Sequence, residues 1–130
     1  MINIKFIFFF ALLTISLKTS GQTKSERLIL GKSYAQQQLN SALSDKVQHN
    51  VIDNESIIIK DSLTAIKIAE PILFSIYGKD NITKQQPYEI YLIDNYWVIT
   101  GTLPEGHKGG TFLIIINAIN NKIIKITHGK

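Results

Sequence analysis

The sequence has no cysteine, a single tryptophan and only three prolines among its 130 residues. Without cysteine, no disulfide can staple the fold and the chain cannot be a lipoprotein. With three scattered histidines and no thiolate ligands, we expect neither a metal site nor a cofactor. A chain of this size is expected to form one domain, stabilised by packing alone.

Residues 1–21 are typical of a cleavable signal peptide. Lys5 precedes an apolar run over residues 6–17, which is shorter than the roughly 20 apolar residues of a membrane span. The small residues around Gly21 suit cleavage after that position. We therefore expect a periplasmic or secreted protein that is not stably inserted in a membrane once the signal is cleaved.

The charge of the mature chain is close to balanced. The net charge of +4 falls to +2 because Lys5 and Lys18 leave with the signal. An excess this small is not the electrostatic footprint of a nucleic-acid-binding protein. We therefore expect no nucleic acid among the partners.

Residues 22–55 form a polar, glutamine-rich segment with little periodicity. Residues 33–43 place Leu39 and Leu43 on one face and could form a helix. The apolar run at residues 57–59 is either a short strand or the lead into the next helix. We treat 22–55 as a partly helical N-terminal segment and residues 56–130 as the folded domain.

Residues 63–77 have the strongest helical pattern in the chain. Asp61 or Ser62 can cap the start, and Gly78 can end the helix with a positive φ. Pro71 falls on the polar side, where the carbonyl that loses its partner can bond to water. We predict that the helix bends at Pro71 and continues.

After a linker at residues 79–86, the pattern changes to the alternation of β-strands. Asp94-Asn95 and Asn120-Asn121 both suit two-residue hairpin turns. The predicted strands are residues 87–93, 96–103, 111–119 and 122–127. The first turn opposes Ile90 with Ile99, and the second opposes Leu113 with His128 and Ile115 with Ile126.

These registers predict a sheet with one apolar face covered by the helix. One face of the first hairpin holds Ile90, Trp97 and Ile99, and the other holds Glu89, Tyr96 and Thr100; the first must be the core face. The third strand is apolar on both sides, so it should be central and partly covered on both faces. Gly101 and His128 should meet at one rim, with the loop at residues 103–110.

The rim could in principle hold catalytic residues. A Ser/Thr–His–carboxylate group is conceivable from Thr102, Thr111, His107, His128 and Glu105. No nucleophile-elbow pattern accompanies it, and the loop glycines do not follow the order of a phosphate-binding loop. We expect no catalytic residues.

The second half of the chain also carries a set of short motifs. They are Ala65-Ile66-Lys67-Ile68-Ala69-Glu70, Tyr77-Gly78, Pro87-Tyr88, Trp97-Val98-Ile99-Thr100-Gly101-Thr102-Leu103-Pro104, Gly109-Gly110-Thr111 and His128-Gly129-Lys130. Together they resemble the immunity proteins with a nuclear-transport-factor-2-like fold, over residues 56–130. The resemblance implies an α+β, cystatin-like arrangement, with a kinked helix packed on a curved four-stranded antiparallel sheet. It also implies that the protein binds and neutralises a cognate bacterial toxin.

The leading hypothesis is an immunity-type binding protein that contacts a toxin through the rim loop. The predicted partner-binding residues all fall at that rim: Glu105, His107, Lys108, Tyr88, His128 and Lys130. One rival is a small-ligand binder or enzyme with a cavity beside Tyr88 and Trp97. Another is an envelope protein that self-associates through its exposed sheet face.

Overall fold

The computed structural model describes residues 27–44 and 49–129. The chain forms two compact units, Met1–Lys46 and Val47–Lys130, and each is considered by itself. The predicted signal peptide at residues 1–21 lies outside the described residues, as does Lys130. Within the described chain, no helix has the length and apolar character needed to cross a membrane.

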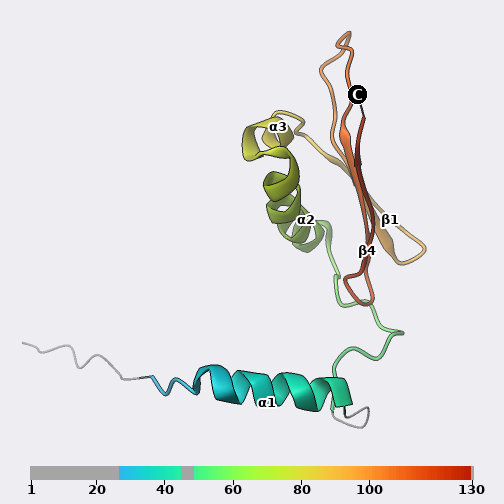
Figure 1. The fold of residues 1–130 in the computed structure, drawn as a ribbon. Coiled ribbons are helices and arrows are strands. Elements are labelled where there is room, and N and C mark those ends of the chain that lie inside the picture. The colour runs from blue at the N-terminus through green and yellow to red at the C-terminus, as the bar shows by residue number, and fades with distance from the viewer. Residues whose placement is uncertain (1–26, 45–48, 130) are drawn as a thin grey trace, which may run out of the picture. The chain divides into compact units, whose positions relative to one another are not determined.

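The described part of the first unit is centred on helix α1, Gly31–Ser44 (Figure 1). This helix confirms the one predicted over residues 33–43. None of its residues is buried, and Leu39 and Leu43 are 52% and 78% exposed.

The second unit has two helices followed by four strands. Helix α3 is a correction, because residues 79–86 were expected to be a linker. It is only one turn long and carries a single buried residue, Ile82, so no apolar period marks it. The elements are α2 (Ser62–Tyr77), α3 (Lys79–Thr83), β1 (Glu89–Ile93), β2 (Tyr96–Thr100), β3 (Phe112–Asn117) and β4 (Ile123–His128).

Helix α2 begins and ends as its sequence predicts. The Asp61 carboxylate accepts a hydrogen bond from Thr64 N at 2.8 Å, and Gly78 follows the last turn with a φ of 85°. Hydrogen bonds from the backbone and side chain of Thr64 hold the pKa of Asp61 below its usual range. The helix continues through the exposed Pro71, so the prediction that proline would not end it is confirmed.

The first hairpin has the predicted turn and register. Asp94 and Asn95 adopt φ values of 45° and 64°, both in the left-handed region that a tight two-residue turn requires. Ile90 lies opposite Ile99, as predicted, and Trp97 lies opposite Leu92.

The second hairpin corrects the predicted register. Leu113 pairs with Thr127 and not with His128, and a bulge between Ile115 and Ile116 shifts the remaining pairs. The cause is a turn longer than two residues, closed by Asn117 N donating to the carbonyl of Lys122 at 2.8 Å. Ile126 therefore faces Ile114 on the core side, not Ile115.

The sheet is antiparallel with strand order β1-β2-β3-β4, and α2 and α3 lie on one side of it (Figure 1). Alternate residues of β3 are fully buried, while the others are half-buried, which confirms its predicted central position. Trp97 is 6% exposed, and its Nε1 donates to the carbonyl of Ile59 at 2.9 Å. The core consists of Ile59, Ala65, Ala69, Leu73, Ile82, Trp97, Ile99, Phe112, Ile114, Ile116 and Ala118.

Candidate functional site

One rim of the sheet gathers the end of β2, the start of β3 and the end of β4. Gly101 N donates to the carbonyl of Phe112 at 3.1 Å, and Phe112 pairs with His128 across β3 and β4. The connection from β2 to β3 extends beyond the strands at this rim (Figure 1). The prediction that Gly101 and His128 meet at one rim is therefore confirmed.

The rim loop, residues 103–110, carries three exposed polar side chains: Glu105, His107 and Lys108. We call these three residues the loop tip. His107 N donates to the carbonyl of Pro104 at 3.1 Å, and Gly106 adopts a φ of 77° to make the turn. His107 Nδ1 also lies 3.4 Å from the carbonyl of Glu105, and all three tip side chains stay exposed to a partner.

Beneath the loop, Gln85 is buried, with 2% of its surface exposed. Its Oε1 accepts from Phe112 N at 2.9 Å, and its Nε2 donates to the carbonyl of Asn81 at 2.9 Å. The same Nε2 lies 3.0 Å from His128 Nε2. The Gln85 carbonyl also accepts from Thr102 N at 2.8 Å, so this one residue joins the end of α3 to β3, to β4 and to the segment that follows β2.

The bonds of Gln85 bear on which ring nitrogen of His128 carries the proton. Because the amide nitrogen can only donate, His128 Nε2 accepts this bond in the tautomer that carries its proton on Nδ1. That proton points to the carbonyl of Gly129, 2.7 Å away. The ring also lies 5.2 Å from the ring of Tyr77. Both nitrogens of His128 are thus engaged within the protein.

Two glycines allow β3 and β4 to close together at this rim. A Cβ on Gly110 would lie 1.9 Å from the backbone carbon of Gly129, a distance that no side chain tolerates. Gly129 N donates to the carbonyl of Thr111 at 3.0 Å and continues the strand pairing past His128. Any side chain at position 110 would separate the strands.

Tyr88 is held at the same rim by α2. Its hydroxyl donates to Glu70 Oε1 at 3.0 Å, and its ring meets Phe112 edge-on at 5.1 Å. Burial, followed by the neighbouring Glu70 carboxylate, raises the pKa of Tyr88 to about 12. We call Gln85, Tyr88, Gly110, His128 and Gly129 the rim base.

A cleft of about 550 Å³ lies between the end of α3 and the rim loop. Its walls include Leu103 and Pro104 from the loop, with Gln85 behind them. Its side chains that can carry charge are all basic: Lys84, His107, Lys108 and His128. No acidic residue of the described chain lines this cleft.

The structure divides the predicted partner-binding residues into two groups. Glu105, His107 and Lys108 are exposed, while Tyr88 and His128 are half-buried and hydrogen-bonded within the rim base. Their role in binding a partner stays a prediction. Sequence reasoning missed Gln85 and Lys84, because both fall in the segment that was expected to be a linker.

The side chains that the catalytic alternative would need are engaged in other contacts. Thr102 Oγ1 donates to the carbonyl of Pro87 at 2.8 Å, and His128 Nε2 faces Gln85 instead of a hydroxyl. Thr111 Oγ1 lies 3.5 Å from Thr100 Oγ1. Among the described residues, no cluster of acidic and histidine side chains is suited to hold a metal ion.

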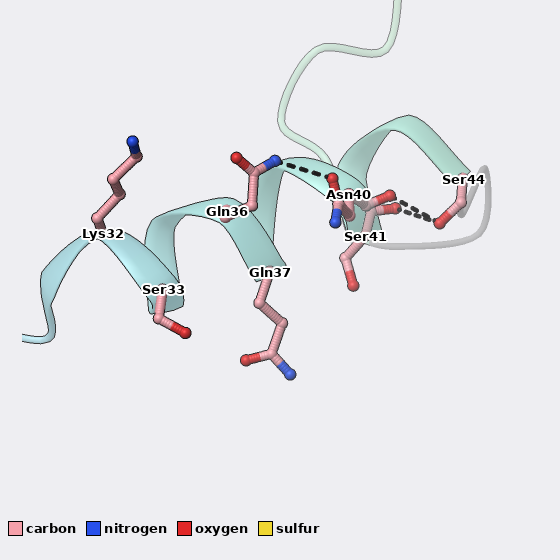
Figure 2. A pocket seen from close by; sticks show the side chains of 7 residues that line it. All are labelled: Lys32, Ser33, Gln36, Gln37, Asn40, Ser41 and Ser44. Atoms are coloured by element: carbon pink, nitrogen blue, oxygen red, sulfur yellow. Dashed lines mark hydrogen bonds between the residues drawn. The ribbon is translucent and has the colours of Figure 1, made fainter.

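A second hollow runs along α1 alone and is lined by polar side chains (Figure 2). Gln36 Nε2 donates to Asn40 Oδ1 at 3.0 Å, and Ser44 Oγ donates to the Asn40 carbonyl at 2.8 Å (Figure 2). These bonds join neighbouring turns of one exposed helix. The hollow therefore has a single wall, and we do not consider it a site.

The sheet face away from α2 is apolar and open in the second unit. Tyr91 and Ile93 are each 53% exposed, and Tyr96 is 36% exposed. Single exposed apolar residues are common on protein surfaces, but these three share one face at the turn end of the first hairpin. This is the surface on which the self-association hypothesis depends.

The fold and rim define an α+β protein whose helix covers one face of a four-stranded antiparallel sheet. The family model of the NTF2 fold immunity protein matches residues 64–130, about half of the chain. The chain therefore belongs to this family. The match spans all four strands and the whole rim, and it supports a role in toxin immunity in general.

Two curated relatives, both from Escherichia coli K12, are similar over this region. The uncharacterized protein YhhH is 32% identical over 74 residues, which cover 56% of this chain and 58% of the relative. The uncharacterized protein YbbC is 33% identical over 73 residues, or 55% of this chain and 60% of the relative. This chain thus spans less than two thirds of either relative. No solved structure matches it significantly.

Proposed function

We propose that this protein is a periplasmic or secreted immunity protein that neutralises a cognate bacterial toxin by direct contact through the loop tip. Family membership supports the class of function, and the predicted signal peptide at residues 1–21 supports the location. The observation that carries the contact is the position of Glu105, His107 and Lys108, exposed on a loop whose base is fixed by buried hydrogen bonds.

A rigid base suits a protein that blocks another protein. Binding costs free energy when loops and side chains must be ordered, and a loop held at both ends loses less freedom. Here Gln85 and the Gly110–Gly129 contact hold the two ends of the loop. The tip offers a carboxylate, an imidazole and an ammonium group, which can pair with charges of either sign on a partner.

The packing of the core favours this binding role over the small-ligand alternative. That alternative needs a cavity lined by Tyr88, Trp97 and a carboxylate. A hollow of about 620 Å³ does lie beside Tyr88, but neither Trp97 nor an acidic residue lines it. Trp97 is 6% exposed with its ring nitrogen bonded, and the Tyr88 hydroxyl is bonded to Glu70. The polar groups that such a ligand would need are therefore engaged within the protein.

The test is rescue of cells from the toxin. The candidate toxin is the product of the neighbouring reading frame, co-expressed with the full chain. Replacing Glu105, His107 and Lys108 together with alanine should abolish rescue and leave the melting temperature unchanged, because exposed side chains contribute little to folding.

The chain offers a matched control with the same three residue types. His49, Glu55 and Lys60 are exposed and lie outside the rim, so their alanine triple should keep full rescue. Rescue that survives the loop-tip triple would remove the tip as the contact. Failure of the wild-type chain to rescue would reject immunity to that toxin.

A further inference from the structure

We propose that the cleft between α3 and the rim loop binds an acidic segment of the toxin, with Lys84 and Lys108 pairing with its carboxylates. This inference rests on the proposed function and adds the chemistry of the partner. It also adds Lys84, which belongs to a different element from the loop tip.

The charge of the cleft is of one sign. Lys84 lines it from the end of α3 and Lys108 from the rim loop, and His107 adds a further basic group. The nearest acidic residues in the sequence, Asp80 and Glu105, are not among the lining residues. Both ring nitrogens of His128 are engaged by Gln85 and Gly129, so the two lysines are the basic groups left to pair with carboxylates.

The shape of the cleft suits side chains of a protein segment. Leu103 is 38% exposed and, with Pro104, offers an apolar wall for the methylene groups of glutamate or aspartate. Gly109 and Gly129 lack side chains, so a partner backbone can approach them closely. The volume of about 550 Å³ exceeds what a single small anion would fill.

The exposure of the two lysines sets how much they contribute to the binding free energy. Lys84 and Lys108 are exposed, so each pairing is screened by salt and contributes modestly. Charges on the rim of an interface mainly speed association, and their effect fades as the Debye length shrinks from about 8 Å at physiological salt. Loss of one lysine should weaken binding about two- to fivefold and flatten its dependence on salt.

The first experiment measures toxin binding by the full chain with Lys84→Gln. The matched control is Lys79→Gln, which removes the same charge from the first residue of α3, outside the cleft, whereas Lys84 directly follows the helix. Lys84→Gln should lower affinity and flatten the salt dependence, Lys84→Arg should restore both, and Lys79→Gln should change neither. An affinity that Lys84→Gln leaves unchanged, while the loop-tip triple abolishes binding, overturns the inference and leaves the proposed function standing.

The second experiment needs no toxin. Tetraglutamate peptide is titrated into ¹⁵N-labelled protein, with the amides of Gly109, Gly110 and Gly129 as reporters. Their shifts should move with the peptide, recover at high salt and disappear in the Lys84→Gln, Lys108→Gln double variant. Equal shifts with inorganic phosphate at the same concentration would make this a small-anion site and contradict the proposal, and so would an absence of shifts. This readout stands even if rescue from the tested toxin fails.

Discussion

The rim base and the loop tip lie in one region of the molecule but differ in what holds them. Gln85 in the base is 2% exposed and makes side-chain bonds to Phe112, Asn81 and His128. The tip side chains are exposed, and the turn beneath them is closed by a single backbone bond from His107 to Pro104.

This difference implies that substitutions in the rim base and in the loop tip should affect different properties, folding stability in the first case and partner binding in the second. A change in the base alters buried bonds that join α3 to the sheet, whereas a change in the tip leaves those bonds intact. The predictions below test whether the two regions are as independent as their contacts indicate.

Gln85→Leu should have the largest effect on folding. Leucine keeps much of the volume but leaves the Phe112 N–H and the Asn81 carbonyl without their partner. The Phe112 N–H is buried and the Asn81 carbonyl is half-buried, so leaving both unsatisfied costs about 3 kcal/mol in the free energy of unfolding, measurable by urea denaturation. The loop-tip alanine triple, run alongside, should stay within about 0.5 kcal/mol of wild type. Similar losses in both variants would mean that the base and the tip are one unit.

Gly110→Ala should have the next largest effect. The added methyl group meets the Gly129 backbone, so β3 and β4 must separate, at a cost of about 2 kcal/mol. Gly106→Ala in the loop is the comparison, since its Cβ meets nothing within 4 Å and only the φ of 77° is strained. That strain costs about 1 kcal/mol. If Gly106→Ala instead lowers the denaturation midpoint more than Gly110→Ala, then backbone conformation in the loop matters more for stability than the close contact between β3 and β4.

The two hairpins show how far the sequence could predict the fold. In the first, Asp94 and Asn95 are the whole turn, so locating them fixes every pair in β1 and β2. In the second, Asn117 enters the turn: its Oδ1 accepts from Ile119 N at 2.8 Å and lengthens the connection. Asn120-Asn121 alone does not reveal this side-chain bond, and the register shifts as a result.

The same limit applies to the candidate site. The loop tip could be placed from sequence because it lies between a strand of alternating pattern and a strand that is apolar on both sides. Gln85 could not, since a polar residue in a polar stretch gives no sign that it is buried. Its burial depends on partners far along the chain, Phe112 and His128, which only the folded sheet brings together. Helix α3 was missed for the related reason that only Ile82 marks it.

Tyr88→Phe should have the smallest effect, and it tests where the base ends. The ring packing on Phe112 is kept, and the lost bond to Glu70 costs about 1 kcal/mol at neutral pH. The pKa of Tyr88 is raised to about 12 in the folded chain, from an ordinary value of about 10. Between these values the folded protein keeps a proton that the unfolded chain releases, so the stability of the wild type falls as pH rises.

The Tyr88→Phe variant has no hydroxyl proton to release. Its free energy of unfolding should therefore fall less steeply with rising pH than that of the wild type. All other groups are common to both proteins and cancel in the difference between their unfolding free energies, measured by urea denaturation across this range. Rescue from the toxin should be unchanged, since the Tyr88 hydroxyl already serves Glu70. If rescue is lost while stability is retained, Tyr88 belongs to the recognition surface, and the boundary between base and tip must be drawn closer to α2.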